Sequence, residues 1–172
     1  HEKALLRDRD VKVCHCPFSN CGKGIPDTPS LLEQGICVGL GTDGAAHGGL
    51  SLWNEMKIFR SVMNAKHGVA QGNPSLVAKQ ILSMATRDGY RLMKEDGGVI
   101  AAGKKADFIT INLRQPHLYP TGNLVNTLLE CVTAADVCDA AVDGQLLMKN
   151  REVLTLDEER ILADAERYMN TL

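Results

Sequence analysis

The chain has 172 residues, a formal net charge of −2 at pH 7, 44% hydrophobic residues and 23% charged residues. This length suits one or two globular domains. The near-neutral charge argues against nucleic acid or an anionic membrane as the main partner, because there is no basic excess to neutralise phosphates. No apolar run reaches the roughly 18–20 residues of a membrane-spanning helix, so no membrane partner is expected.

The start of the chain and its cysteines indicate its cellular context. Residues 1–6 (HEKALL) resemble the middle of a helix, without an initiator methionine or a visible secretory leader. We therefore expect the true N-terminus to be missing.

The 6 cysteines lie mostly in apolar, strand-like contexts. A secreted disulfide scaffold is not expected at this length, so we predict reduced thiols and a cytoplasmic location.

The first third of the chain predicts a helix, a strand and a loop. Residues 1–10 have a helical stripe, and residues 11–15 alternate and are rich in β-formers, which predicts a short strand. Thr28 or Ser30 can cap a short helix that runs through Glu33. The segment that follows the predicted strand is predicted to be a loop, because it holds many residues that break both helix and strand. These residues are Pro17, Ser19, Asn20, Gly22, Gly24, Pro26 and Pro29.

The next segment continues the alternation of helix and strand. Residues 36–40 are a continuous apolar run, typical of a strand buried on both faces of a parallel sheet, and the run ends in GTDG at residues 41–44. Apolar residues three or four apart predict an amphipathic helix over 52–63. A further helix is predicted from Asn73-Pro74 to near Gly89. Alternation of this kind predicts an α/β fold with parallel strands.

The pattern changes near residue 98. Residues 108–113 alternate with period two, which predicts a half-exposed strand. An Asp-Gly pair between two β-prone runs predicts a hairpin over 137–149. A charged helix is expected over 156–172, opened by Thr155 or Asp157. We therefore predict two domains, 1–98 and 99–172.

Two segments follow predicted buried strands and could hold the chemistry, residues 15–20 (HCPFSN) and 41–49 (GTDGAAHGG). Ligands of parallel α/β folds bind at the carboxyl ends of strands. An ionised Asp43 there is costly unless it is paired or bound to a metal, although it could equally be a turn residue or a helix cap. His15 could be a satisfied core histidine, and His47 a surface loop residue.

Other motifs predict less. The C-x-C pair at residues 14–16 and Cys21 resemble part of a zinc cluster, but no fourth ligand is evident. The glycine-rich stretch 44–49 lacks the Gly-Lys-Ser/Thr ending of a phosphate-binding loop. Ser19 and Thr42 have no visible base partner, so a nucleophile is not predicted.

Several motifs together carry a family resemblance. The segments 15–20, 31–46, 103–109 and 142–144 resemble the amidohydrolase superfamily. The branch they are similar to contains triazine hydrolases, guanine deaminases and methylthioadenosine/adenosylhomocysteine deaminases. The resemblance implies an α/β chain that forms the last two strands and helices of a metal-dependent (β/α)8 barrel. Part of a small β-sandwich domain and a C-terminal helix would follow.

The resemblance also implies that the barrel is incomplete, since a complete one needs about 250 residues. Residues 1–10 match the helix after the sixth barrel strand, 11–16 match the seventh strand and 36–43 match the eighth. The family's metal-binding histidines of the first, fifth and sixth strands, with the glutamate near the fifth, have no counterpart here. His1 lies within the predicted helix and takes none of these roles.

The resemblance assigns a role to Asp43, which matches the aspartate that binds the metal and handles the proton of the attacking water. His15 and Asn20 would line the substrate pocket. His47 stands where Asn or Ser is commoner in the family, and would either bind substrate and tune its choice or only replace an exposed amide. The resemblance implies one divalent metal, for which zinc is the favoured ion and iron the alternative. Such a cation lowers the pKa of bound water toward neutrality, and a carboxylate can pass the proton to the leaving group.

The predicted activity is deamination or dechlorination of a small purine-, pyrimidine- or triazine-like ring. The isolated chain is expected to be inactive, because one ligand cannot hold a catalytic zinc. The alternatives are a non-catalytic fragment or an assembly domain and, less favoured by the context of residues 42–46, a cyclic-amide hydrolase. The open edges of a two-strand remnant predict self-association.

Overall fold

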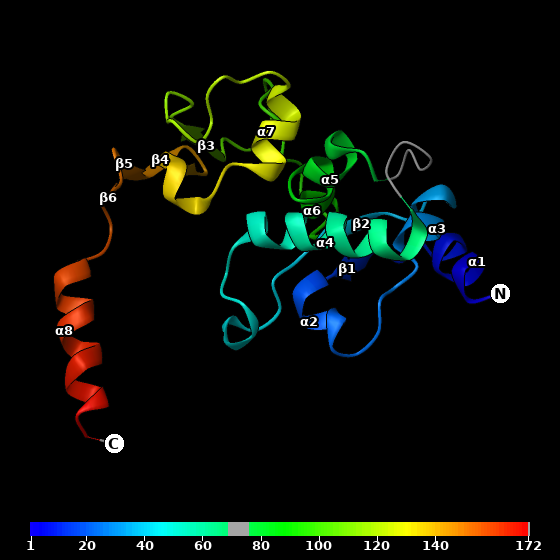
Figure 1. Cartoon of the computed structure of the whole chain (residues 1–172), viewed down its shortest axis with the longest axis horizontal. Coiled ribbons are helices and arrows are strands. Elements are labelled where there is room, and N and C mark those ends of the chain that lie inside the picture. Colours follow the sequence, from blue (N-terminus) through cyan, green and yellow to red (C-terminus); the bar gives the residue numbers. More distant parts are fainter. Residues whose placement is uncertain (69–75, 172) are drawn as a thin grey trace.

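The structure is a computed structural model that describes residues 1–68 and 76–171, with the backbone but not the side chain of His47. Helices surround a two-stranded parallel sheet, a four-stranded antiparallel sheet lies beside them, and the last helix stands apart (Figure 1). The α/β content agrees with the prediction. In chain order the elements are α1 (Glu2–Asp8), β1 (Val13–His15), α2 (Pro17–Cys21), α3 (Thr28–Glu33), β2 (Val38–Leu40), the 3₁₀ turn η1 (Ala45–His47), α4 (Leu52–His67), α5 (Ala78–Met84), α6 (Arg87–Leu92), β3 (Phe108–Ile111), α7 (Leu124–Glu130), η4 (Ala134–Asp136), β4 (Val137–Val142), β5 (Gln145–Lys149), β6 (Glu152–Val153) and α8 (Glu158–Met169).

The parallel pair β1–β2 organises the N-terminal half. The strands pair in register from Val13 with Val38 to His15 with Leu40, which confirms both predicted strands and their parallel direction. All three residues of β2 are buried, as the apolar run predicted. Because parallel strands end at the same edge, the segments that follow His15 and Leu40 emerge side by side.

Helix α4 covers this sheet and contributes three of the buried residues of the core. Its buried residues include Met56, Phe59 and Met63, which confirms the helix predicted from the apolar stripe. Ser51 caps its start by accepting a hydrogen bond from the backbone N–H of Asn54. The buried residues of the core cluster are Leu31, Ile36, Val38, Leu40, Met56, Phe59, Met63, Leu76, Ala78, Ile81, Met84 and Leu129.

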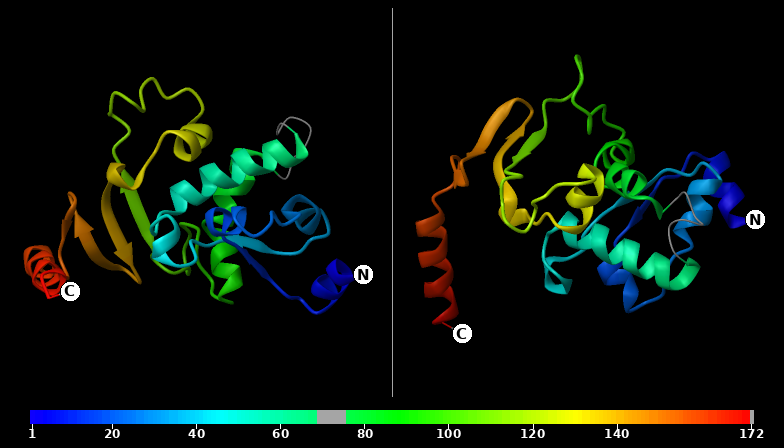
Figure 2. Two further views of the ribbon diagram at one scale, coloured as in Figure 1. Left: turned by 60° about the horizontal axis from the view of Figure 1, so that its bottom comes forward. Right: turned by 45° about the horizontal axis from the view of Figure 1, so that its top comes forward.

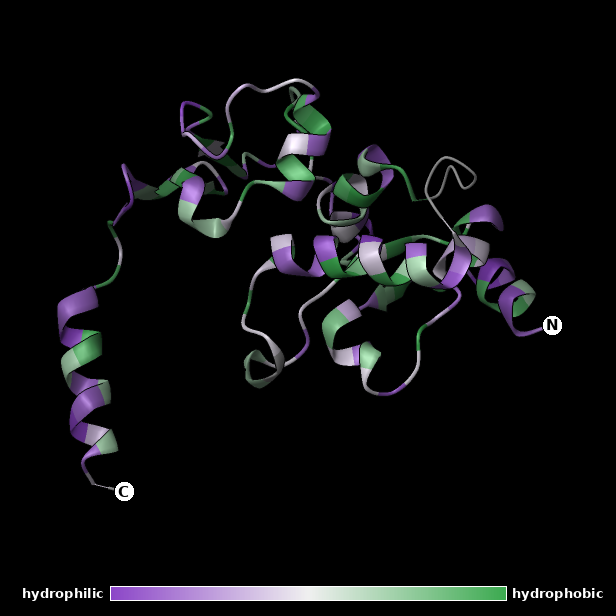
Figure 3. Ribbon diagram, in the orientation of Figure 1, coloured by the Kyte–Doolittle hydropathy of each residue, from purple (hydrophilic) through white to green (hydrophobic). Residues whose placement is uncertain are grey.

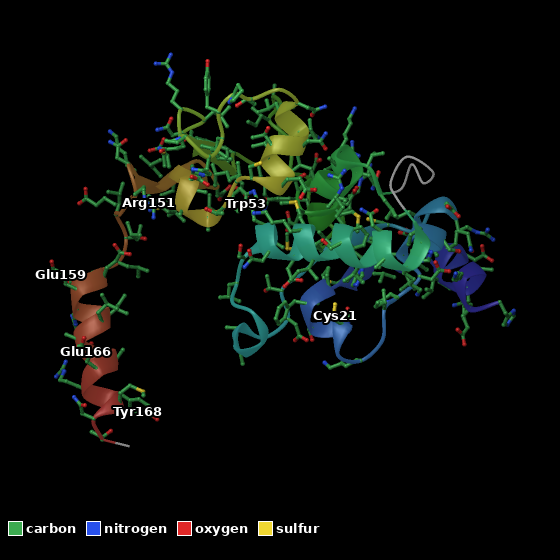
Figure 4. The ribbon with its side chains drawn as sticks, viewed as in Figure 1. Cys21, Trp53, Arg151, Glu159, Glu166 and Tyr168 are labelled. Carbon is green, nitrogen blue, oxygen red and sulfur yellow. The ribbon has the colours of Figure 1, made fainter. Side chains whose placement is uncertain are left out.

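Helix α7 joins this core although it lies late in the sequence. The indole N–H of Trp53 donates to the carbonyl of Leu128 at 3.0 Å (Figure 4), and Arg60 pairs with Glu130 at 2.7 Å. The Lys57 ammonium donates to the carbonyl of Val132 at 3.0 Å. The segment after residue 98 thus contributes directly to the core of the first half. The domain division at residue 98 stays a prediction.

Two short elements near the N-terminus correct the sequence expectations. The segment predicted as a loop begins with helix α2, because Pro17 occupies the first helical position, where the missing N–H costs nothing. Helix α3 begins after Asp27, not after the expected Thr28 or Ser30 caps. Its first turn has no side-chain cap, and the Asp27 carboxylate accepts a hydrogen bond from Lys3 at 2.5 Å.

The helix predicted from residue 73 is also corrected. Its expected start at 73–74 lies outside the described residues, and the rest forms two helices, α5 and α6. They meet at Ala85 and Thr86, where the Thr86 hydroxyl donates to the carbonyl of Leu82 at 2.8 Å. Gly89 lies inside α6 and does not end a longer helix.

The antiparallel sheet has the order β3-β4-β5-β6 (Figure 2). The predicted hairpin is confirmed, with β4 and β5 joined by Asp143 at φ +51° and Gly144 at φ +77°. Positive φ at both central residues is what a two-residue type I′ turn needs. The described residues form one sheet here, so the second sheet of the expected sandwich is not among them.

Helix α8 stands away from the rest of the described chain (Figure 1) and has no buried residue. Asp157 caps it by accepting a hydrogen bond from the Arg160 N–H, which confirms one of the two predicted caps. Apolar and polar residues fall on different sides of this helix (Figure 3). Among the helices in the described ranges, none has the length and hydropathy to cross a membrane.

Candidate active site

The segments that follow β1 and β2 meet at the shared edge of the parallel sheet. The Ser19 hydroxyl, in helix α2 after β1, donates a hydrogen bond of 2.6 Å to Oδ2 of Asp43, which follows β2. Ser19 is 5% exposed, whereas the Asp43 side chain is 49% exposed. Asp43 therefore lies beside the end of the neighbouring strand with part of its carboxylate open to solvent.

The backbone and neighbours of Asp43 restrict its carboxylate further. Asp43 has φ +56°, in the left-handed region that aspartate adopts more readily than most residues. The N–H of Gly44 donates to Oδ1 at 2.9 Å, and the Lys23 ammonium lies 4.0 Å from Oδ2. Gly44, not Asp43, is the N-cap of η1, so the helix-cap alternative does not describe this residue.

Glycines allow the two segments to approach each other. A Cβ at Gly41 would lie 2.7 Å from the sulfur of Cys14 and 3.2 Å from that of Cys16. A Cβ at Gly48 would lie 3.0 Å from the ring of Phe18. The loop after β2 thus packs against β1 at one point and against α2 at another, and a larger residue at either position would separate them.

His15 lies on the helix-covered face of the sheet. It is 2% exposed, its Nδ1 is 2.9 Å from the Thr28 hydroxyl, and its ring packs edge-on against Phe59 with centroids 5.4 Å apart. Burial lowers the pKa of His15 to about 4, so the imidazole is neutral at neutral pH. Its contacts are those of a satisfied core histidine, and a role in lining the substrate pocket stays a prediction.

The other two predicted pocket residues are Asn20 and His47. Asn20 is half-buried and its Oδ1 accepts a hydrogen bond of 3.2 Å from the N–H of Cys16, which closes the turn between β1 and α2. The backbone of His47 belongs to η1. Its side chain lies outside the described atoms, so substrate contacts for Asn20 and His47 stay predictions.

The thiols and carboxylates of the described residues do not form a complete metal site. Desolvation and the neighbouring Cys16 thiol raise the pKa of Cys14 to about 11, which keeps this thiol protonated at neutral pH. The described part of the chain contains no group of three or more His, Cys, Asp or Glu side chains that could hold a metal ion. Three protein ligands are usual for a catalytic zinc, so the described residues do not hold one by themselves, and a ligand role for Asp43 stays a prediction.

One functional candidate was missed in the sequence. Glu55, on α4, is 2% exposed and its Oε2 accepts a hydrogen bond of 2.9 Å from the N–H of Phe18 in α2. An acidic residue three positions after Leu52 and four before Phe59 falls on the apolar stripe of the predicted helix. That position was the available signal, since a carboxylate on a core face needs a partner.

A protein-family model described as the Amidohydrolase family matches residues 1–148. The chain belongs to this family. The resemblance drawn from the motifs is thereby confirmed. The chain is 38% identical over 170 residues to the 5-methylthioadenosine/S-adenosylhomocysteine deaminase of Dictyoglomus thermophilum, a match that covers 96% of this chain and 39% of that protein.

Two solved structures share the fold. An adenosine deaminase from Xanthomonas campestris with bound zinc matches with a TM-score of 0.92 and 26% identity, over 99% of this chain and 39% of that one. An atrazine chlorohydrolase from Arthrobacter aurescens, in complex with zinc, matches with a TM-score of 0.79 and 27% identity, over 96% of this chain and 37% of that one. The chain therefore spans about two fifths of the length of these relatives. Which barrel strands β1 and β2 represent stays a prediction.

The buried imidazole makes folding stability depend on pH. The pKa of His15 falls from about 6.5 in the unfolded chain to about 4 in the folded one, so between these values only the unfolded chain takes up the proton. We expect the His15 contribution to disappear as the pH falls from 6.5 to 4, lowering the free energy of unfolding by up to about 3 kcal/mol. Urea unfolding at several pH values, compared with His15→Gln, measures it. Equal pH dependence of the two proteins in this window would contradict the expectation.

Proposed function

We propose that this chain forms part of a metal-dependent hydrolase that deaminates a purine-like ring. The observation that carries the proposal is the hydrogen bond of 2.6 Å between Ser19 and Asp43, which holds a carboxylate at the mouth of two parallel strands. Family membership and the deaminase named among the relatives favour an amino leaving group on an adenine-like ring. Pyrimidine- and triazine-like rings, and chloride as leaving group, belong to the wider substrate class.

Asp43 has two roles in this proposal. It is one ligand of a divalent metal, zinc first and iron as the alternative, and such a metal lowers the pKa of bound water toward neutrality. The Asp43 carboxylate accepts the proton of the attacking water and returns it to the leaving nitrogen, as a general base and then a general acid. Its partial exposure leaves room for substrate, and the bonds from Ser19 and Gly44 orient the oxygens.

The remaining predicted residues act around this carboxylate. Asn20 and His47 are proposed at the rim of the substrate pocket, because each lies within a few residues of Ser19 or Asp43 in the two segments that meet. His15 is proposed to support the pocket from behind, since its ring is held between Thr28 and Phe59.

A cytoplasmic location agrees with the free state of all the cysteines.

Replacing Asp43 tests the catalytic role. In the longer protein that the proposal implies, we expect Asp43→Asn and Asp43→Ala to lower kcat for adenine-nucleoside deamination by about 10²–10⁴-fold, because the proton acceptor is lost. Zinc content, measured by elemental analysis, should fall as well. Glu159→Gln, which changes an exposed carboxylate on α8, is the control and should keep activity within about twofold. Normal zinc content and normal activity in Asp43→Ala would refute the proposal.

The chain alone should show neither tight zinc binding nor turnover. Asp43 is one ligand, and a catalytic zinc needs about three from the protein. Equilibrium dialysis of the 172-residue chain against zinc should therefore give far less than one ion per chain. Ammonia release from adenine nucleosides should equal that of the buffer. Stoichiometric zinc together with turnover would show that the site is complete within this chain.

We also propose that the isolated chain self-associates. In the described residues β1 and β2 pair only with each other, so each leaves one open edge that can accept another strand. We expect multi-angle light scattering to give a mass above that of the monomer, rising with protein concentration. A strictly monomeric mass over a tenfold range of concentration would contradict it.

A further inference from the structure

Glu55 is a buried carboxylate whose partner is a backbone amide. It is 2% exposed, and its Oε2 accepts the N–H of Phe18 at 2.9 Å. Two other buried carboxylates, Asp88 and Asp136, pair with Arg91 and His117, whereas the ion pairs found between described residues do not include Glu55. A buried polar side chain is costly unless it is hydrogen-bonded, so the bond from the Phe18 N–H is one that the fold has to keep.

The contact with Phe18 places helix α2. Pro17 has no N–H, so the Phe18 amide is the first donor that this helix can offer to α4. The ring of Phe18 meets the loop after β2, where a Cβ at position 48 would lie 3.0 Å from the ring. The backbone N–H of Phe18 is thus bound by Glu55, and the ring of Phe18 packs against Gly48.

Ser19 is the next residue, and its hydroxyl has a defined direction. The Lys23 ammonium donates to the Ser19 oxygen at 3.3 Å. An ammonium group can only donate, so the hydroxyl hydrogen must point elsewhere. It points to Oδ2 of Asp43, 2.6 Å away, while the N–H of Gly44 binds Oδ1 at 2.9 Å. Both carboxylate oxygens are therefore oriented by donors of this chain.

We propose that Glu55 and Ser19 are positioning residues for Asp43. Glu55 holds the start of α2 through the Phe18 amide, and the Ser19 hydroxyl then holds the Asp43 carboxylate in one rotamer. The carboxylates of Glu55 and Asp43 are thus linked through Phe18 and Ser19, which are neighbours in the first turn of α2. The catalytic meaning of this arrangement rests on the proposed function of Asp43, whereas the positioning itself can be measured without any activity.

The first experiment uses the isotope-labelled 172-residue chain and solution NMR. Glu55→Ala should speed amide exchange of Phe18 about tenfold or more, because the acceptor of its hydrogen bond is lost. Glu55→Gln keeps an acceptor oxygen and should restore most of the protection. Ser19→Ala should shift the Asp43 Cγ resonance and average its χ1 couplings, and Ser19→Thr should restore both.

Asp136→Ala is the matched control, since it removes another buried carboxylate that also accepts a backbone N–H, from Thr133 at 2.8 Å. It should leave Phe18 exchange and the Asp43 couplings unchanged. If Glu55→Ala does not fold, Ser19→Ala decides alone, because it removes only a hydroxyl. A single, unchanged Asp43 rotamer in folded Ser19→Ala would overturn the proposal.

The second experiment separates this proposal from the proposed function. In the longer protein, Ser19→Ala should lower zinc retention and kcat about 10–100-fold, the usual loss for a group that orients a metal ligand. If Asp43→Ala is fully active while Ser19→Ala still releases the Asp43 rotamer, the catalytic function fails and the positioning stands. If Asp43→Ala is inactive but Ser19→Ala leaves the rotamer unchanged, the positioning fails and the function stands.

Discussion

The parallel pairing of β1 with β2 is the constraint on which the rest of this molecule depends. Because both strands end at the same edge, residues 24 positions apart in the sequence come within hydrogen-bond distance as Ser19 and Asp43. An antiparallel pair of the same strands would send their following segments to opposite ends of the sheet. The candidate site is therefore a consequence of strand direction first and of side-chain chemistry second.

The helix-covered side of this short sheet and its carboxyl edge have different roles in the structure. On the side covered by α3 and α4, His15 binds Thr28 and packs on Phe59, which makes the strand rigid without adding charge. Glu55, from the same covering helix, reaches past the edge to the start of α2. The edge that carries the candidate site is thus supported from the helical layer behind it, which agrees with the general need to place functional side chains on rigid elements.

The chain holds part of the length of its family's members. It belongs to the amidohydrolase family, yet it spans about two fifths of the length of its relatives and its described residues offer no complete metal-binding group. Its core is nevertheless shared between distant segments, because Trp53, Lys57 and Arg60 of α4 all bind residues in or just after α7. The ordered placement of Asp43 therefore arises within this chain, while catalysis in our proposal needs further ligands.

The sequence by itself determined the features that depend on local pattern. The apolar run at 36–40, the stripe on α4 and the Asp-Gly turn of the hairpin each have a period or a backbone requirement that can be read from neighbouring residues. The motifs at 15–20, 31–46, 103–109 and 142–144 together likewise indicated the family. Only the tertiary structure decided which side chains meet: that His15 faces Phe59, that Glu55 binds Phe18, and that α7 joins the core. The reason is that these contacts join residues far apart in the chain, and the distance between two such residues depends on the packing of the elements and not on the residues next to them.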